Sequence, residues 1–111
     1  MSFGKMITQI SIMRVDFVTD DSGFKNRKDV LIAETRAYHE GRHGSVRWVN
    51  LAAFSSATDL FRIRMIPGVE VTPDNYILCG GVRYKIHSVE NVKSRGMYLE
   101  ILAERTAGVV G

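Results

Sequence analysis

The fold is decided by the stretch from Tyr76 to Glu104, which reads YILCGGVRYKIHSVENVKSRGMYLEILAE. It contains a short apolar run that ends in Gly80–Gly81, followed by two longer runs in which apolar and polar residues alternate. Alternation with a period of two indicates strands that bury one face. A glycine pair between two strands supplies the positive φ angles that a tight hairpin turn needs. This part of the chain therefore predicts antiparallel β-structure.

The same alternation predicts which side chains face the core. In this stretch the inward-facing residues are expected to be Val82, Tyr84, Ile86, Met97, Leu99 and Ile101. If the connecting turn spans residues 91–96, Arg83 lies near Glu104 and Lys85 lies near Glu100. Opposite charges on facing strands contribute about 0.2–1 kcal/mol each, so the charges support this register independently of the apolar pattern.

The first half of the chain carries further segments with strand or turn character. Residues 6–17 are dense in isoleucine, methionine and valine on both parities, so we expect a strand that is covered on both faces. The turn cluster DDSG follows, and residues 24–29 then read as an exposed connection. Residues 29–40 fit a strand better than a helix, because Gly41 and Gly44 would cut a helix short.

The middle of the chain contains one clear strand and one ambiguous segment. Residues 59–66 alternate as a strand whose inward residues are expected to be Phe61, Ile63 and Met65. Residues 45–56 space Trp48 and Leu51 as on one helical face, which fits a short helix or a loop that becomes ordered on assembly. The whole pattern predicts a mainly β fold, a small antiparallel barrel or sandwich of five to six strands with a long central loop or short helix.

Size and composition limit the class of protein. With 111 residues, of which 45% are apolar and 24% charged, the chain is expected to form a single domain over residues 1–111. The net charge of +3 permits contact with nucleic acid but does not require it. Cys79 is the only cysteine, so an internal disulfide is excluded. No window approaches the ~18 apolar residues of a membrane span, and no secretory signal is visible. We therefore expect assembly in a cytosol, without a membrane partner.

One string has the spacing of a catalytic metal site. His39-Glu40-Gly41-Arg42-His43 matches H-E-x-x-H, which on a helix presents two histidines to zinc and a glutamate as general base. Gly41 interrupts the helix that this chemistry requires. The preferred interpretation is a strand end that enters a glycine-rich loop, with no catalytic residue, metal or cofactor. A small zinc hydrolase that uses His39 and His43 is the least favoured alternative.

Two groups of basic residues are candidates for contact with phosphate. The first group is Lys25, Arg27 and Lys28, and the second, in the central loop, is Arg42, His43 and Arg47. A solvated surface is the preferred interpretation of each group, because a net charge this modest usually serves solubility.

Aromatic residues suggest a further class of binding site. The set Phe61, Tyr84 and Tyr98 resembles the base-stacking face of an oligonucleotide-binding barrel. The inward parity of Phe61 and Tyr84 favours core packing instead. A monomeric oligonucleotide-binding β-barrel is therefore kept as the main alternative function.

Several short motifs, taken in their order along the chain, resemble those of the bacteriophage head–tail joining proteins, also called head–tail adaptor or head-closure proteins. They are Gly4-Lys5 with Ile10-Ser11-Ile12, the strand end Tyr38-His39-Glu40-Gly41-Arg42, the strand Phe61-Arg62-Ile63-Arg64, and the two hairpin strands within residues 81–89 and 95–101. The resemblance covers nearly the whole chain.

This resemblance implies a non-enzymatic connector of the virion neck, built as a ring of β-barrel-like subunits beneath the portal. The implied partners are further copies of the chain, the portal or connector protein, a tail-completion or tail-tube protein, and DNA that passes the channel without sequence specificity. It also implies that the loop from residue 41 to residue 56 faces the channel or a neighbouring subunit. The loop residues expected at such contacts are Arg42, His43, Arg47, Trp48, Leu51 and Phe54, the last three buried only on assembly.

Overall fold

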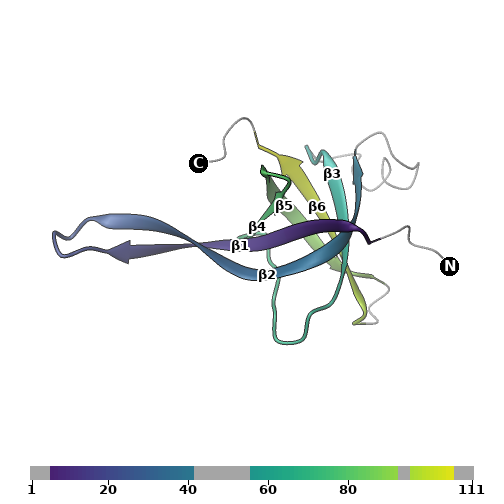
Figure 1. The fold of residues 1–111 in the computed structure, drawn as a ribbon, viewed down its shortest axis with the longest axis horizontal. Helices are drawn as coiled ribbons and strands as arrows, with labels where there is room; N and C mark the ends of the chain where they lie inside the picture. The colour runs from purple at the N-terminus through teal and green to yellow at the C-terminus, as the bar shows by residue number, and fades with distance from the viewer. Residues whose placement is uncertain (1–5, 42–55, 93–95, 107–111) are drawn as a thin grey trace.

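The computed structural model describes residues 6–41, 56–92 and 96–106, and this part of the chain is built of strands and turns (Figure 1). Residues 42–55, which hold the expected central loop or helix, lie outside the described ranges. The strands of the described part are β1 (Thr8–Thr19), β2 (Lys25–Gly41), β3 (Asp59–Arg64), β4 (Tyr76–Cys79), β5 (Val82–Asn91) and β6 (Tyr98–Arg105). No helix in these ranges is long and apolar enough to cross a membrane.

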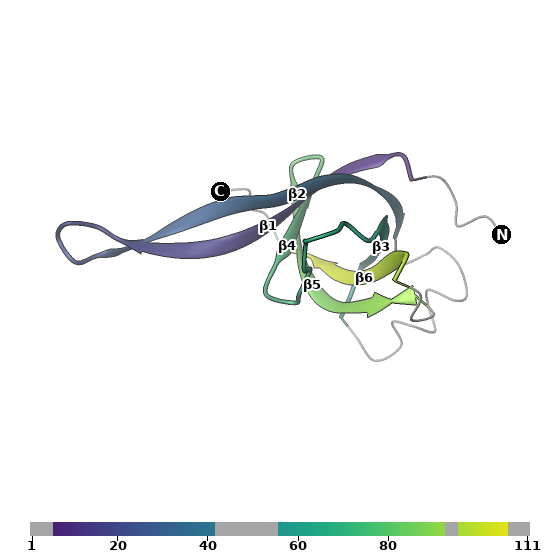
Figure 2. The same ribbon diagram turned by 90° about the horizontal axis from the view of Figure 1, so that it is seen from below.

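The strands close into an antiparallel barrel in the order β1-β2-β3-β6-β5-β4 (Figures 1 and 2). β1 completes the closure because it pairs with β2 along one edge and with β4 along the other, where Ser11 faces Leu78 and Met13 faces Tyr76. Closure gives the barrel segments of the strands hydrogen-bonded neighbours on both sides. The predicted mainly β fold is confirmed, and of its two forms it is the barrel that occurs.

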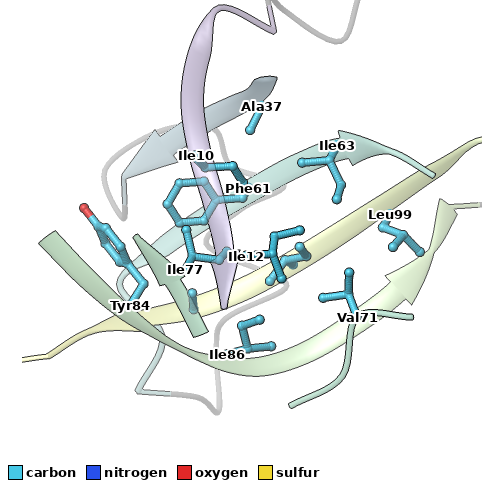
Figure 3. Packing of buried hydrophobic residues seen from close by; sticks show 12 residues of the cluster. Ile10, Ile12, Ala37, Phe61, Ile63, Val71, Ile77, Tyr84, Ile86 and Leu99 are labelled. Atoms are coloured by element: carbon cyan, nitrogen blue, oxygen red, sulfur yellow. The ribbon is translucent and has the colours of Figure 1, made fainter. Parts of the chain in front are cut away.

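Alternate side chains of the barrel strands fill the interior (Figure 3). Phe61 is fully buried, stacks on the His39 ring with centroids 4.4 Å apart, and meets the Tyr84 ring edge to face at 5.1 Å. Burial of one large apolar side chain contributes about 1.5–3 kcal/mol, so burial of the Phe61 ring stabilises the barrel substantially. The inward orientation is confirmed for Phe61, Ile63, Tyr84, Ile86, Leu99 and Ile101.

Two methionines that were expected in the core are on the surface. β3 ends at Arg64 and β6 begins at Tyr98, so Met65 and Met97 lie just beyond the end of the barrel. The Met65 N–H donates to the Met97 carbonyl oxygen at 2.9 Å, and the Met97 side chain is 57% exposed. The prediction was wrong because alternation continues one residue past the point where the barrel wall stops.

The tight turn between β4 and β5 has the predicted form. Gly80 and Gly81 adopt φ angles of 58° and 81°, and Cys79 and Val82 face each other across the turn. Two successive positive φ angles match the twist of a two-residue hairpin turn and are accessible to glycine at little cost.

The register between β5 and β6 differs from the predicted one. Lys85, not Arg83, faces Glu104, and Glu100 faces Glu90. The pairing shifts between Ile86 and Ser88, where β5 contains an extra residue. A β-bulge of this kind is set by backbone geometry and leaves no mark in the apolar pattern, so the expected pairs Arg83–Glu104 and Lys85–Glu100 were wrong.

β1 and β2 are long, and their distal halves leave the barrel as a two-stranded arm (Figures 1 and 2). We define the arm as residues 13–31. Residues 25–29, which were expected to form an exposed connection, belong to β2 and pair with residues 15–19 of β1. The side chains of residues 25–29 are exposed as expected. The connection was wrongly inferred because strand pairing uses backbone groups and does not require apolar side chains.

The tip of the arm is closed by the predicted turn cluster. Asp20 Oδ1 accepts hydrogen bonds from the backbone N–H groups of Ser22 and Phe24, each at 2.9 Å. Gly23 takes a φ of 83°. The hydrogen bond from the Phe24 N–H is the main reason that the pKa of Asp20 lies below its ordinary value. The acidic pair at positions 20 and 21 is thus part of an exposed turn, as expected.

A β-bulge marks the point where the arm leaves the barrel. Ile12 faces Ala33, whereas Met13 faces Leu31, so Ile32 is an extra residue in β2. Pairing of β1 with β4 also ends at Met13. Bulges bend a strand and increase its local twist. We infer that this bulge turns the paired strands out of the barrel wall.

Candidate functional site

The arm has an apolar face. Facing residues of a β-ribbon share a side, so the pairs Met13–Leu31 and Phe17–Arg27 lie on one face, together with Val15. Phe17 is 67% exposed and Leu31 is 50% exposed. The expectation that both sides of residues 6–17 are covered was therefore wrong, because the strand runs beyond the barrel before Phe17 is reached. We call Met13, Val15, Phe17 and Leu31 the apolar face of the arm.

The basic residues of the arm do not form one cluster. Lys25 and Arg27 share the apolar face, whereas Lys28 faces Asp16 on the opposite side. Arg27 Nε contacts Asp29 Oδ1 at 3.0 Å, which neutralises part of its charge locally. All three side chains are exposed. Contact of Lys25, Arg27 and Lys28 with phosphate remains a prediction, and their two-sided placement favours the solvated-surface interpretation.

A groove of about 360 Å³ with largely apolar walls lies beside the C-terminal end of β5. We call it the end groove. Its apolar walls come from the 66–75 connection and from the neighbouring ends of β3, β5 and β6, and they are Met65, Val69, Val71, Val89 and Leu99. Val71 and Leu99 also belong to the core, so the floor of the groove is rigid. Glu70, which is exposed, adds a negative charge to the lining.

A second groove, of about 520 Å³, lies at the root of the arm. Here the Arg83 guanidinium lies over the Tyr76 ring at 3.9 Å from its centroid, a cation–π contact. Val15 and Lys85 also line this groove. The contact links β4 and β5 next to the arm.

A histidine–carboxylate pair lies where β2 and β3 adjoin residues 42–55. His39 Nε2 donates to Asp59 Oδ2 at 2.6 Å, and the Thr58 hydroxyl donates to Asp59 Oδ1 at 2.6 Å. Asp59 is buried. The Thr58 hydroxyl oxygen also accepts a hydrogen bond from the Arg105 N–H at 2.8 Å. These bonds anchor the first residues of β3 to both neighbouring strands.

The H-E-x-x-H string does not form the helical metal site. His39 and Glu40 are consecutive residues of β2, so they point to opposite sides of the sheet. His43 lies outside the described residues, and within them no group of three histidine, cysteine or acidic side chains is arranged to hold a metal. The preferred interpretation of His39 as the end of a strand is confirmed.

A second histidine–carboxylate pair lies on the outside of the barrel. His87 Nε2 donates to Glu104 Oε1 at 2.7 Å, and the Ser56 hydroxyl donates to the same oxygen at 3.0 Å. The Ser56 hydroxyl lies 3.5 Å from His87 Nε2. In a hydrolytic triad the serine and the acid contact opposite nitrogens of the imidazole, whereas here both contact Nε2. The cluster therefore links β5, β6 and Ser56 by side-chain hydrogen bonds.

The hydrogen bonds of this cluster predict a pH effect on stability. The hydrogen bonds from His87 and then Ser56 hold the pKa of Glu104 below its ordinary value of 4.5. A lowered carboxyl pKa contributes stability above the unfolded value, and the contribution is lost as the pH falls through the folded value. We expect the stability difference between wild type and Glu104→Gln to shrink as the pH is lowered through 4.5 and below. Urea titrations at several pH values measure it, and a constant difference would contradict the assignment.

Two of the three residues proposed for base stacking have buried side chains. Phe61 and Tyr84 are buried in the core, and burial raises the pKa of the Tyr84 hydroxyl. Tyr98 is half-buried at the start of β6. The inward interpretation of Phe61 and Tyr84 is confirmed, which removes the aromatic argument for an oligonucleotide-binding face.

The loop candidates lie outside the described residues. They are Arg42, His43, Arg47, Trp48, Leu51 and Phe54. The structure describes the residues on either side of them, with Gly41 facing Asp59 at the ends of β2 and β3. The roles expected for these residues at assembly contacts remain predictions.

A closed barrel that projects an arm with exposed apolar side chains has the form of an assembly subunit, since such surfaces mark sites where proteins meet. The comparison with protein families is specific. The family model of phage head completion proteins matches residues 1–106, and the chain belongs to this family. It is therefore a structural protein of the phage head, located in the virion and in contact with other head and tail proteins.

Solved structures agree with the fold. Protein SF1141 from Shigella flexneri 2a, known from a solution structure, aligns with a TM-score of 0.74 and 15% identity, over 96% of this chain and 98% of that chain. A chain from the virion of a native gene transfer agent particle aligns with a TM-score of 0.58 and 18% identity, over 95% of this chain and 99% of that chain. At these identities the two neighbours support the fold alone. No curated protein sequence matches the chain.

Proposed function

We propose that the protein is a non-enzymatic connector that forms a ring between the portal and the tail, closes the filled head and passes the DNA. The observation that carries the proposal is membership of the phage head completion family over residues 1–106. The arm supports it, because Phe17 and Leu31 expose apolar surface that a subunit interface would cover.

The proposed ring has closed rotational symmetry, as most protein oligomers have. Its partners are further copies of the chain, the portal protein on one side and a tail-completion or tail-tube protein on the other. DNA passes through the channel without sequence-specific contacts, which the net charge of +3 permits. Assembly takes place in the host cytoplasm, and the loop from residue 41 to residue 56 faces the channel or a neighbouring subunit.

The proposal is tested with purified protein, alone and mixed with the portal protein of the same phage. Light scattering measures the mass in solution, and negative-stain electron microscopy shows the shape of the particles. We expect rings, either free or on the portal. A protein that stays monomeric and does not bind the portal under any condition would contradict the connector function.

A further inference from the structure

We propose that the arm of one copy docks, by its apolar face, into the end groove of the next copy around the ring. This inference rests on the proposed function and specifies the subunit contact that builds the ring. It commits to a second copy of this chain as the occupant of the groove.

The arm needs a partner. It is a two-stranded ribbon that extends past the barrel, and an isolated two-stranded ribbon is at best marginally stable in water. Its apolar face exposes Phe17 and Leu31, and Phe24 at the tip is 70% exposed. Pairing of β1 with β4 ends at Met13, so the arm beyond it depends on its own two strands. A surface that covers one face of the ribbon would bury these side chains.

The end groove has the matching chemistry. Its apolar walls are aliphatic and thioether side chains, and Met65 at its rim is partly exposed. Flexible methionine side chains adapt to an inserted aromatic ring. The groove of about 360 Å³ is open to the outside, and the proposed contact places the protruding Phe17 side chain in it.

The placement of the two surfaces requires different copies. The arm projects from one side of the barrel, and the end of β5, which lines the end groove, lies on the opposite side in both views (Figures 1 and 2). An arm therefore cannot reach the groove of its own chain. Two different surfaces that meet between copies form a heterologous contact, which closes into a ring when the rotation between neighbours permits.

The charges at the two surfaces are complementary. Lys25, which faces Thr19, lies on the same side of the ribbon as Phe17 and two residue pairs closer to the tip. Glu70 lines the end groove. A lysine on the inserted face of the arm and a glutamate in the lining of the receiving groove place opposite charges at the proposed contact, which would set its orientation.

The first experiment tests contact by disulfide formation between copies. Both proteins carry Cys79→Ser, one also Phe17→Cys and the other Val69→Cys, and they are mixed under mild oxidation with and without the portal protein. We expect a disulfide-linked heterodimer from the mixture. The control replaces Phe17→Cys by Val18→Cys, which lies on the opposite side of the ribbon, and should give at least tenfold less product.

The second experiment tests the same contact through assembly. Phe17→Ser should weaken assembly at least tenfold, because the buried phenyl group is lost, whereas the matched Val18→Ser should have little effect. Lys25→Glu or Glu70→Lys alone should weaken assembly, and mixing the two variants should restore it, since the charges then match again across the contact. Circular dichroism checks that each variant keeps its β-structure.

The outcomes separate this inference from the proposed function. Rings that give no disulfide between the Phe17→Cys and Val69→Cys variants, and that tolerate Phe17→Ser, overturn the docking contact and leave the connector function standing. The same result arises if a portal or tail protein covers the arm instead. Absence of any ring or portal binding overturns the connector function and, with it, this contact.

Discussion

Replacing Phe61 with alanine is expected to lower the free energy of unfolding by about 3–5 kcal/mol. Phe61 is fully buried at the centre of the barrel, where it stacks on His39 and meets Tyr84 edge to face. Alanine removes the ring and leaves a cavity that the closed wall of strands cannot collapse to fill. The losses of packing and of the aromatic contacts act together. Urea unfolding followed by far-ultraviolet circular dichroism measures the change.

The matched control is the same substitution on the arm. Phe17 is 67% exposed, so Phe17→Ala should change the stability of the dilute protein by no more than about 0.5 kcal/mol. Equal losses for the two variants would show that Phe61 is not the centre of the core. Removal of Phe17 should instead affect assembly.

Replacing Glu100 with leucine is expected to lower the free energy of unfolding by about 3–5 kcal/mol. The Arg62 Nη2 atom donates to Glu100 Oε2 at 2.6 Å, and both side chains are buried, with 5% and 4% exposure. Leucine removes the carboxylate that pairs with the buried guanidinium, and removing one partner of a buried ion pair is strongly destabilising. The Arg62 guanidinium also lies 5.7 Å from the centre of the Tyr38 ring, a contact too weak to replace the ion pair.

A double variant separates the cost of a broken pair from the contribution of the pair itself. Arg62→Met combined with Glu100→Leu replaces both charges by apolar side chains of similar length. Such replacements are often neutral or stabilising, so most of the lost stability should return. A double variant as unstable as Glu100→Leu would show that the site depends on the arginine through contacts other than this ion pair.

The strands of the barrel were predictable because their signals are local. The alternation around Tyr84 and Phe61 and the glycine pair at Gly80–Gly81 depend on neighbouring residues only, and these predictions are confirmed. Residues 29–40 were correctly assigned to a strand because Gly41 and Gly44 opposed the helix. Family motifs in their sequence order then indicated the phage head protein class, which the family match confirms.

The candidate site was largely missed. Residues 24–29 were interpreted as a connection because they are mostly charged or polar. Their pairing with β1 uses backbone groups and leaves no alternation of apolar and polar residues. A usable signal existed, since the turn cluster DDSG is flanked by Val15 and Phe17 on one side and Leu31 on the other. The end groove gave no signal, because it is assembled from the ends of three strands and one connection.

Local composition thus determined the strand content, the core-facing parity of most barrel residues and the glycine turn, because each depends on side chains a few positions apart. The tertiary structure decided at which residue the alternating apolar side chains cease to be buried. It places Phe17 and Met97 outside the barrel, pairs Glu100 with Arg62 and shifts the β5–β6 register at the bulge. Those outcomes depend on how strands distant in the chain meet and on where the barrel wall ends, and no local pattern of residues encodes either.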